Sequence, residues 1–434
     1  MLLKKKQLFK YISLALVLCS GSVYALEFHG YARGGVFTST NGEMKSYRLN
    51  NLGRFGNEVD GYYDMAFQDQ IFSDDSGRRF DIRVDAEGNM DLRNNWESVG
   101  DDTSSDDDSL SSTNNPLAVT QFFVEGYGYI PSLPDASIWV GKRSYKSREL
   151  QMFDYKLIGV FGPGAGIDHI KVGPGNLSLA WIRNDSTADV KVSDADASNT
   201  LNNNNILDFR YADIPLFNDV KGEVLVNYSL INDTEAQKYN EANGTNYKAE
   251  NSLQSSFIMT VPLDKGFNET VIQYGDGGQA SNMVNHGYYL QANSDFADAK
   301  GYRIVNYGEE YLTDNIIANH AIAYAYADEL GDGLGYEKAQ ELSVAFRPEY
   351  IWNHYSKSAV ELSWFGREET SGSTTDEYSG YKVTVAQVIS VGESQFVRPE
   401  IRIYSTYLKA NDETPFADDK DSQLSFGVQM EAWW

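Results

Sequence analysis

The sequence predicts an all-β protein, a closed transmembrane antiparallel β-barrel. Three observations support this fold class. Many short segments alternate strictly between apolar and polar residues, as expected for strands with one apolar face. After residue 25 no apolar run reaches the ~20 residues that a membrane helix needs. Aromatic residues make up 13% of the 434 residues, with 29 tyrosines, although the mean hydropathy is a polar −0.45.

The first 25 residues have the order of a secretory signal peptide. A basic start over Lys4–Lys10 precedes an apolar run over Tyr11–Leu18, and small residues lead to Ala25. This order predicts cleavage after Ala25, and the apolar run is too short to span a membrane. Cleavage removes four lysines, no acidic residue and the only cysteine, Cys19, so the net charge changes from −26 to −30. The sequence therefore predicts an exported, thiol-free single barrel domain over 26–434.

The chain end helps to decide between two architectures that the alternation allows. A soluble β-sandwich turns its apolar faces inward, whereas a membrane barrel turns them towards lipid. Polar faces such as Asp81, Arg83 and Asp85 suit either solvent or a water-filled lumen. Leu424–Trp434 reads LSFGVQMEAWW and alternates up to a terminal tryptophan, which is typical of outer-membrane barrels. A closed barrel also satisfies every backbone hydrogen bond, as the hydrocarbon core demands, so we favour the barrel.

Composition and motifs argue against several classes of function. The acidic net charge of −26 excludes a non-specific nucleic-acid binder, which needs a basic surface. The sequence contains no nucleophile elbow, P-loop or dinucleotide fingerprint, and its five histidines form no close pair. We therefore expect no enzyme activity, no catalytic residue, no cofactor and no metal site.

Three acidic stretches are expected to form solvated loops: Asp101–Ser112, Ser186–Asn205 and Asn411–Ser422. Clustered carboxylates also suit weak divalent-cation bridges to lipopolysaccharide or to a neighbouring subunit. No stretch has the spacing of an EF-hand, so that alternative stays open and no residue is assigned as a metal ligand.

The segment FHGYARGG (Phe28–Gly35) resembles the start of the maltoporin family of outer-membrane sugar porins. Further motifs follow in family order across essentially the whole mature chain. They are GNEVDGYYDM (Gly56–Met65), NNWE (Asn94–Glu97), IWVGKRSY (Ile138–Tyr145), GPGAG (Gly162–Gly166), KGFN (Lys265–Asn268), RPEYIW (Arg347–Trp352), RPEIRIYSTY (Arg398–Tyr407) and MEAWW (Met430–Trp434). The resemblance implies a homotrimer of 18-stranded barrels in the outer membrane, in contact with lipid and lipopolysaccharide, with a constriction loop folded inward. It also implies facilitated diffusion of maltose, maltodextrins or a related oligosaccharide.

In this family a row of aromatic side chains lines the channel, and sugar rings slide along it. The motifs carry this row over to six rings, namely Tyr31, Tyr62, Trp96, Phe267, Trp352 and Trp433. Trp96 is implied to reach into the channel of a neighbouring subunit. The alternation itself places Tyr31, Tyr62 and Trp433 on polar faces, and therefore towards the lumen. For Trp352 and Phe267 taken alone, packing at an interface or in the core is the alternative.

The polar side of the family's channel carries over less completely. Matched by motif, it comprises Arg33, Arg54, Asp64, Arg148, Glu149, Asp154 and Lys156. Arg148 is one residue out of step with the family's arginine, and Thr120 replaces another arginine. Lys156 aligns with the tyrosine that narrows the family's channel, unless the alignment slips by one residue onto Tyr155. A flexible cation at this position would widen the gap, donate hydrogen bonds or attract an anionic ligand.

Other functions stay open at this stage. A general, charge-selective porin without sugar specificity would share the barrel. A family member for another sugar, such as sucrose or β-glucosides, would differ at the constriction loop. A membrane-embedded hydrolase would need a serine–histidine pair, for which the sequence gives no support.

Overall fold

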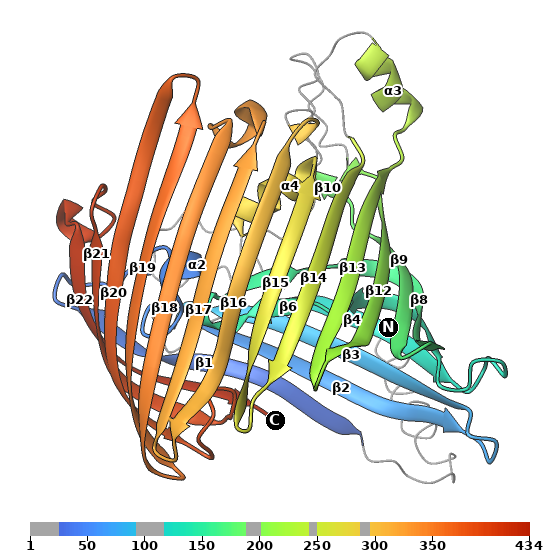
Figure 1. Cartoon of the computed structure of the whole chain (residues 1–434), viewed down its shortest axis with the longest axis horizontal. Coiled ribbons are helices and arrows are strands. Elements are labelled where there is room, and N and C mark those ends of the chain that lie inside the picture. The colour runs from blue at the N-terminus through green and yellow to red at the C-terminus, as the bar shows by residue number, and fades with distance from the viewer. Residues whose placement is uncertain (1–25, 93–116, 188–200, 243–249, 287–295) are drawn as a thin grey trace, which may run out of the picture.

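The computed structural model describes residues 26–92, 117–187, 201–242, 250–286 and 296–434. Within them, eighteen strands form one sheet in which each strand pairs antiparallel with two neighbours. The sheet closes on itself because β1 pairs with β22 as well as with β2 (Figure 1). Closure leaves no unpaired sheet edge, as a membrane requires. This confirms the predicted closed antiparallel barrel of 18 strands; the predicted signal peptide lies outside the described residues.

The barrel strands follow one another in chain order. They are β1 (Glu27–Ser39), β2 (Gly61–Ser73), β3 (Arg79–Met90), β4 (Leu117–Tyr127), β5 (Ser137–Ser144), β8 (Phe161–Val172), β9 (Gly175–Arg183), β12 (Asn204–Phe217), β13 (Val220–Ile231), β14 (Ser252–Pro262), β15 (Gly266–Asp276), β16 (Lys300–Thr313), β17 (Ile316–Asp328), β18 (Lys338–Asn353), β19 (Ser356–Ser371), β20 (Thr374–Ser390), β21 (Glu400–Ala410) and β22 (Ser422–Trp433).

The remaining elements are short and lie in the connections. They are the helices α2 (Leu49–Leu52), α3 (Glu235–Ala242) and α4 (Gly278–Asn285), the 3-10 turns η1 (Gln151–Phe153), η3 (Gly331–Leu334) and η4 (Ala417–Asp419), and the two-stranded pairs β6 (Arg148–Leu150) with β7 (Tyr155–Ile158) and β10 (Ser186–Thr187) with β11 (Leu201–Asn202). None of the described helices is long and apolar enough to cross a membrane.

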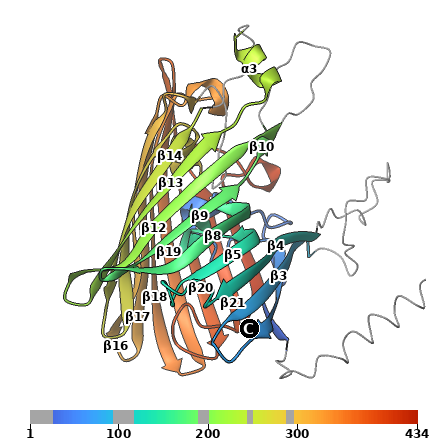
Figure 2. The ribbon, with the colours of Figure 1, turned by 90° about the vertical axis from the view of Figure 1, so that its right-hand side faces the viewer.

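The two rims of the barrel differ in their connections. Short turns such as 173–174 and 218–219 alternate with long loops such as 40–60 and 145–160. The C-terminus lies at the short-turn rim, whereas α3 stands at the opposite, long-loop rim (Figures 1 and 2). Strands β18, β19 and β20 have 16, 16 and 17 residues, whereas β5 and β9 have only 8 and 9. The wall is therefore uneven in height.

The two faces of the wall have opposite chemistry. On β22, Gln429 and Glu431 are buried inside the barrel, whereas Val428 and Met430 are exposed on the outer face. Successive side chains of a strand point to opposite faces, so one strand supplies both surfaces. A soluble sandwich would bury the apolar face, whereas this barrel exposes it, as expected next to lipid. The membrane-barrel interpretation of the alternation is confirmed.

The loop between β5 and β8, residues 145–160, folds into the barrel and is called the constriction loop below. Its apolar side chains pack against inward-facing apolar side chains of the wall, such as Trp139 and Leu225. Burying one such side chain stabilises the folded chain by about 1.5–3 kcal/mol. The carbonyl oxygen of Leu157 also accepts hydrogen bonds from Gln273 at 2.9 Å and from Arg303 at 3.2 Å. The predicted inward-folded loop is thus observed, and both packing and hydrogen bonds hold it to the wall.

A second inward-folded connection, residues 40–60, holds the constriction loop from the opposite side. The amide Nδ2 of Asn50 donates to the carbonyl oxygens of Phe153 and Asp154 at 3.1 and 2.6 Å. The backbone N–H of Arg54 donates to the carbonyl oxygen of Met152 at 3.1 Å. The two loops together therefore narrow the lumen to a fixed passage.

The acidic stretches have mixed outcomes. Asp101–Ser112 lies outside the described residues, as does the middle part of Ser186–Asn205. Asn411–Ser422 forms a loop at the long-loop rim, but its Phe416 is buried against Tyr47. Among the described residues, no group of three or more His, Cys, Asp or Glu side chains is arranged to hold a metal ion.

Candidate functional site

A cavity of about 1010 Å³ lies beside the constriction loop inside the barrel. Its lining includes four basic and four acidic residues, so it carries no strong net charge. These residues are Arg33, Arg54, Lys142 and Lys156, and Asp64, Glu87, Glu149 and Asp154. Amide, hydroxyl and aromatic groups complete the lining. A balanced, mostly polar passage of this size suits a neutral, hydroxyl-rich solute better than an ion of one sign.

Three aromatic rings form a cluster on one side of this cavity. The strand register pairs Tyr31 with Trp433 and Arg33 with Tyr62, so all three rings project inward from adjacent strands. The ring of Tyr31 lies 5.9 Å from that of Tyr62 and 6.4 Å from that of Trp433, measured between centroids. All three rings line the cavity, which agrees with their predicted lumen orientation. They are called the strand-borne trio below.

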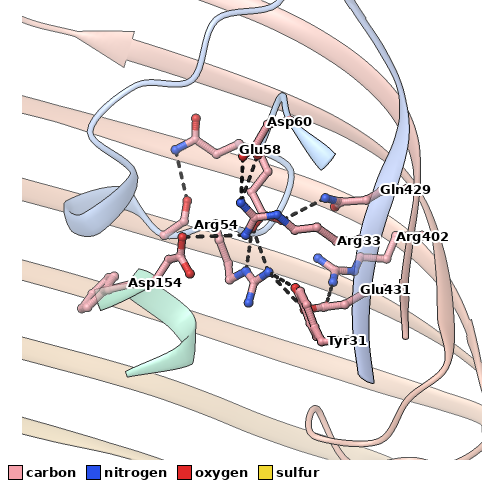
Figure 3. A network of polar contacts seen from close by, with 12 residues as sticks. Tyr31, Arg33, Arg54, Glu58, Asp60, Asp154, Arg402, Gln429 and Glu431 are labelled. Carbon is pink, nitrogen blue, oxygen red and sulfur yellow. Dashed lines mark hydrogen bonds and ion pairs between the residues drawn. The ribbon is translucent and has the colours of Figure 1, made fainter. Parts of the chain in front are cut away.

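A buried network of charges holds Tyr31, one ring of the trio (Figure 3). The hydroxyl of Tyr31 donates to Glu431 at 2.8 Å and accepts from Arg54 at 2.7 Å. Arg54 also pairs with Glu58 at 2.9 Å, and Arg33 pairs with Glu58 at 2.6 Å. Buried, charge-assisted hydrogen bonds of this kind hold side chains in defined positions. The sequence-predicted residues Arg33 and Arg54 are therefore brought to the site and line the cavity, where Arg54 holds the Tyr31 hydroxyl and the Arg33 guanidinium lies 5.8 Å from the ring centroid of Tyr62.

Glu58, which accepts from both arginines, belongs to the inward-folded segment 40–60. Burial acts to raise the pKa of this carboxyl, but the neighbouring Arg54 and Arg33 guanidiniums outweigh it and hold the pKa below 4.5. The network therefore keeps its charges at neutral pH.

Two further rings lie near the short-turn rim. The ring of Phe267, at the start of β15, is 5.7 Å from that of Phe396 and 5.9 Å from that of Tyr307. Phe396 belongs to the connection 391–399 between β20 and β21 and lines the cavity. Phe267 does not itself line the cavity but joins the aromatic path through Phe396. These two rings, one at the start of β15 beside the turn 263–265 and one in the connection 391–399, are called the turn-borne pair.

The expectation for Trp352 is wrong, because its ring lies on the outer face of the barrel. Trp352 is 61% exposed and packs at 4.7 Å against Tyr350, which is also exposed, while the intervening Ile351 is buried inside. The indole Nε1 of Trp352 donates to Ser358 at 2.8 Å, in the short-turn region of β18 and β19. An irregularity in the pairing of β18 with β19 falls between Ile351 and Asn353. Aromatic rings at this level of a membrane barrel suit the lipid–water interface.

Phe396 is a channel residue that the motif matching missed. It lies in an irregular connection, where the two-residue period gives no orientation. Its only sequence signal is its place two residues before the RPEIRIYSTY motif, at Arg398.

Glu87 is a second cavity residue that the sequence analysis does not name. Its sequence signal is present, because Glu87 continues the inward face of Asp81 and Asp85 on β3. Its carboxylate accepts a hydrogen bond from the hydroxyl of Tyr62. Trp96 lies outside the described residues.

The constriction loop presents its polar side chains to the cavity. Lys156 Nζ donates to Glu149 at 2.6 Å, and both side chains are about one-third exposed, at 30% and 37%. Tyr155 also borders the cavity but is only 3% exposed, with its ring 4.9 Å from that of His286, so the more exposed lysine projects further into the passage. Asp154 lines the cavity 3.9 Å from Arg33.

The charged residues of the predicted polar side fall into two groups, those that line the cavity and one, Arg148, that binds the opposite wall. Asp64 lines the cavity beside Glu87, with which it is paired in register on β2 and β3. Arg148 instead reaches the opposite wall, where it binds Glu223 at 2.8 Å and Glu269 at 2.8 Å. Arg148 therefore anchors the constriction loop and is not among the residues that line the cavity. Burial raises the pKa of the Asp154 carboxyl above its ordinary 3.8, against the opposing effect of Arg54.

The family model described as LamB porin matches residues 26–434. The chain belongs to the LamB porin family. Membership makes this LamB porin a channel of the outer membrane and not an enzyme. Maltoporin 1 of Aeromonas salmonicida is 35% identical over 442 residues, covering 100% of both chains. The maltoporin of Photobacterium profundum is 33% identical over 442 residues, covering 98% of this chain and 97% of that one.

Solved structures agree on the fold of this LamB porin. The crystal structure of Acinetobacter baumannii OccAB1 superposes with a TM-score of 0.52 at 12% identity, covering 96% of this chain and 98% of that one. Acinetobacter baumannii OccAB2 gives a TM-score of 0.51 at 11% identity, covering 96% and 99%. At such low identity these similarities concern the barrel architecture alone.

Proposed function

We propose that this LamB porin is a sugar-selective channel that lets maltose, maltodextrins or closely related oligosaccharides diffuse across the outer membrane. The observation that supports this most is the meeting, in one cavity, of the strand-borne trio with a balanced set of charged and amide groups. The relatives that carry the name maltoporin, at 31–35% identity over the full length, support the same substrate class.

The two sides of the cavity match the two parts of a sugar. A pyranose has C–H groups on its ring faces and hydroxyls around its equator. The rings of Tyr31, Tyr62 and Trp433 offer flat apolar area, and its burial contributes about 25 cal/mol per Å². Charged side chains facing the hydroxyls replace lost water through hydrogen bonds that contribute about 1.5–3 kcal/mol each. Phe396 and Phe267 then offer a further resting place towards the short-turn rim. A series of shallow sites lets a sugar bind and still leave, as conduction requires.

We propose that Lys156 and Glu149 tune which sugar passes. Their ion pair is exposed to the cavity, so each partner can exchange its hydrogen bond for one with a sugar hydroxyl. Exposed ion pairs are weak, at about 0–1 kcal/mol, so this exchange costs little. A flexible lysine in place of a rigid aromatic ring also leaves a wider gap, and we expect a preference shifted away from long linear maltodextrins.

We further propose a homotrimer in which Trp96 enters a neighbouring subunit's channel. The support is the NNWE motif over Asn94–Glu97 and the full-length resemblance. Native mass spectrometry in detergent should show three chains per particle. Trp96→Ala should weaken sugar binding without changing that mass.

The decisive experiment is conductance of the purified protein in planar bilayers, titrated with maltohexaose, maltose, sucrose and cellobiose. We expect concentration-dependent block by at least one of these sugars, with an apparent Kd in the millimolar range or below. Such a Kd corresponds to a standard binding free energy of about −4 kcal/mol or more negative. An open channel that no sugar blocks, with conductance that follows only the charge and size of salt ions, would identify a general porin instead.

A further inference from the structure

We propose that Glu309 and Lys357 are positioning residues that hold the connection 391–399 so that the Phe396 ring stands in the channel. This inference rests on the proposed function, because the position of the ring matters for a sugar that passes it. It assigns a role to two buried charges of the wall that do not line the cavity.

The first contact is an anion that captures a backbone N–H. Glu309 lies on β16, faces inward and is only 4% exposed. Its Oε2 accepts a hydrogen bond from the backbone N–H of Gln395 at 2.7 Å and from the hydroxyl of Ser394 at 3.1 Å. The same hydroxyl accepts from the backbone N–H of Phe396 at 3.1 Å. The carboxylate therefore fixes the two residues directly before the ring and, through Ser394, the amide of the ring-bearing residue itself.

The second contact is a cation that captures backbone carbonyls. Lys357 lies on β19 and is 3% exposed, and its Nζ pairs with Glu349 at 2.6 Å. The same nitrogen donates to the carbonyl oxygen of Glu393 at 2.8 Å and, more weakly, to that of Ser394 at 3.4 Å. The connection thus meets a negative group at its N–H side and a positive group at its carbonyl side, which fixes its orientation as well as its position.

A third contact ties the far end of the connection to the strand-borne trio. Arg398 donates to the carbonyl oxygens of Gln395 and Val397 at 2.7 and 2.9 Å and binds Glu431 at 2.7 Å. Its guanidinium also lies 4.8 Å from the ring of Trp433. Phe396 is therefore held between two anchored ends, with its ring against Phe267. An outward movement of the connection would leave both buried charges without their backbone partners, which favours the inward position of the connection.

Single-cysteine labelling tests the position of the ring directly. The only native cysteine is Cys19, so residues 26–434 contain no thiol and Phe396→Cys introduces a single one there. A charged methanethiosulfonate reagent should lower the conductance of Phe396→Cys in one step per labelled channel. Adding Glu309→Ala should reduce that conductance step by about half or more, because the connection is no longer held inward. Glu310→Ala, the exposed neighbour on the same strand, is the matched control and should leave the step unchanged.

Sugar kinetics test the consequence for transport. Phe396→Ala and Glu309→Ala should each speed sugar dissociation by about three- to tenfold, with little change in association from the long-loop side. In the Phe396→Ala background, Glu309→Ala should change dissociation by less than about twofold, because both act through one ring. Glu309→Gln keeps an acceptor oxygen and should restore most of the wild-type residence time.

The outcomes separate the two proposals. Additive effects in the double variant, or an unchanged labelling step in Phe396→Cys with Glu309→Ala, would overturn the positioning role. Absence of sugar block in the wild type would overturn the proposed function, while the labelling result would still decide the positioning role. Should Glu309→Ala fail to give heat-modifiable barrels, Ser394→Ala leaves the wall intact and removes the hydroxyl that links Glu309 to the backbone N–H of Phe396, so it should reduce the labelling step in the same direction but by less.

Discussion

The strand-borne trio and the turn-borne pair reach the same channel by different physical means. Tyr31, Tyr62 and Trp433 sit on regular strands, so the pleat of the strand turns them inward. Phe396 sits in an irregular connection and is held inward by buried charges on distant strands. The inward direction of a ring on a strand therefore follows from local geometry, whereas that of a ring on a turn depends on the tertiary structure. We expect substitutions near the two groups to differ accordingly.

The largest effect is expected in the trio. Tyr62→Ala or Trp433→Ala removes a flat ring from the centre of the path and should weaken sugar binding about tenfold, or about 1.4 kcal/mol. Current-fluctuation analysis of sugar block measures the binding constant. Trp352→Ala is the matched control, because its ring lies outside the lumen. A comparable loss with Trp352→Ala would contradict the placement of the two rings.

A moderate effect is expected in the pair. Phe396→Leu keeps apolar volume but loses the flat face, so binding should weaken by about two- to fivefold, less than in Phe396→Ala. Because Phe396 lies near the short-turn rim, association of sugar added on that side should change more than association from the other side. Equal changes from both sides would show that the pair is not an asymmetric end of the path.

A smaller effect is expected at the constriction loop, which faces the trio across the cavity. Lys156→Tyr should lower the open-channel conductance and strengthen block by maltohexaose by about two- to threefold, because a rigid ring replaces a hydrated cation. Lys156→Met separates the loss of charge from the gain of a ring. Lys338→Met, on the outer face, serves as the control. Unchanged selectivity among maltohexaose, sucrose and cellobiose in Lys156→Tyr would remove this residue from the determinants of specificity.

The smallest effect concerns protonation of the loop. Because the pKa of Asp154 is raised above its ordinary 3.8, its carboxyl takes up a proton at a higher pH than in the unfolded chain. Its negative charge thus opposes folding at neutral pH, and this cost disappears as the pH falls through the raised pKa. The cation preference of Asp154→Asn should be lower than that of the wild type at pH 7, and on acidification the two should converge at a higher pH than they would for a carboxyl of ordinary pKa. A difference that disappears only in the pH range in which an ordinary aspartate is protonated would show that the pKa is not raised.

The contrast between strand and turn also explains which sequence predictions succeeded. The two-residue period placed Tyr31, Tyr62 and Trp433 correctly, because each belongs to an uninterrupted strand. It would also have placed Trp352 outside, since Phe346 and Tyr350 share its face and are exposed. The RPEYIW motif instead assigns Trp352 to the channel, whereas the ring that lies beside Phe267 belongs to Phe396.

The sequence by itself determined that the chain is a barrel with an apolar outside and a polar inside. The reason is that alternation is a local property of each strand, so every strand of the closed sheet supplies one apolar and one polar face. It also pointed to most of the charged groups around the cavity. Only the tertiary structure decided that Arg148 anchors the constriction loop to the opposite wall, that Lys156 projects while Tyr155 is buried, and that Phe396 completes the path. These placements depend on contacts between residues far apart in the sequence, such as Arg148 with Glu269, 121 positions on, and no local pattern records them.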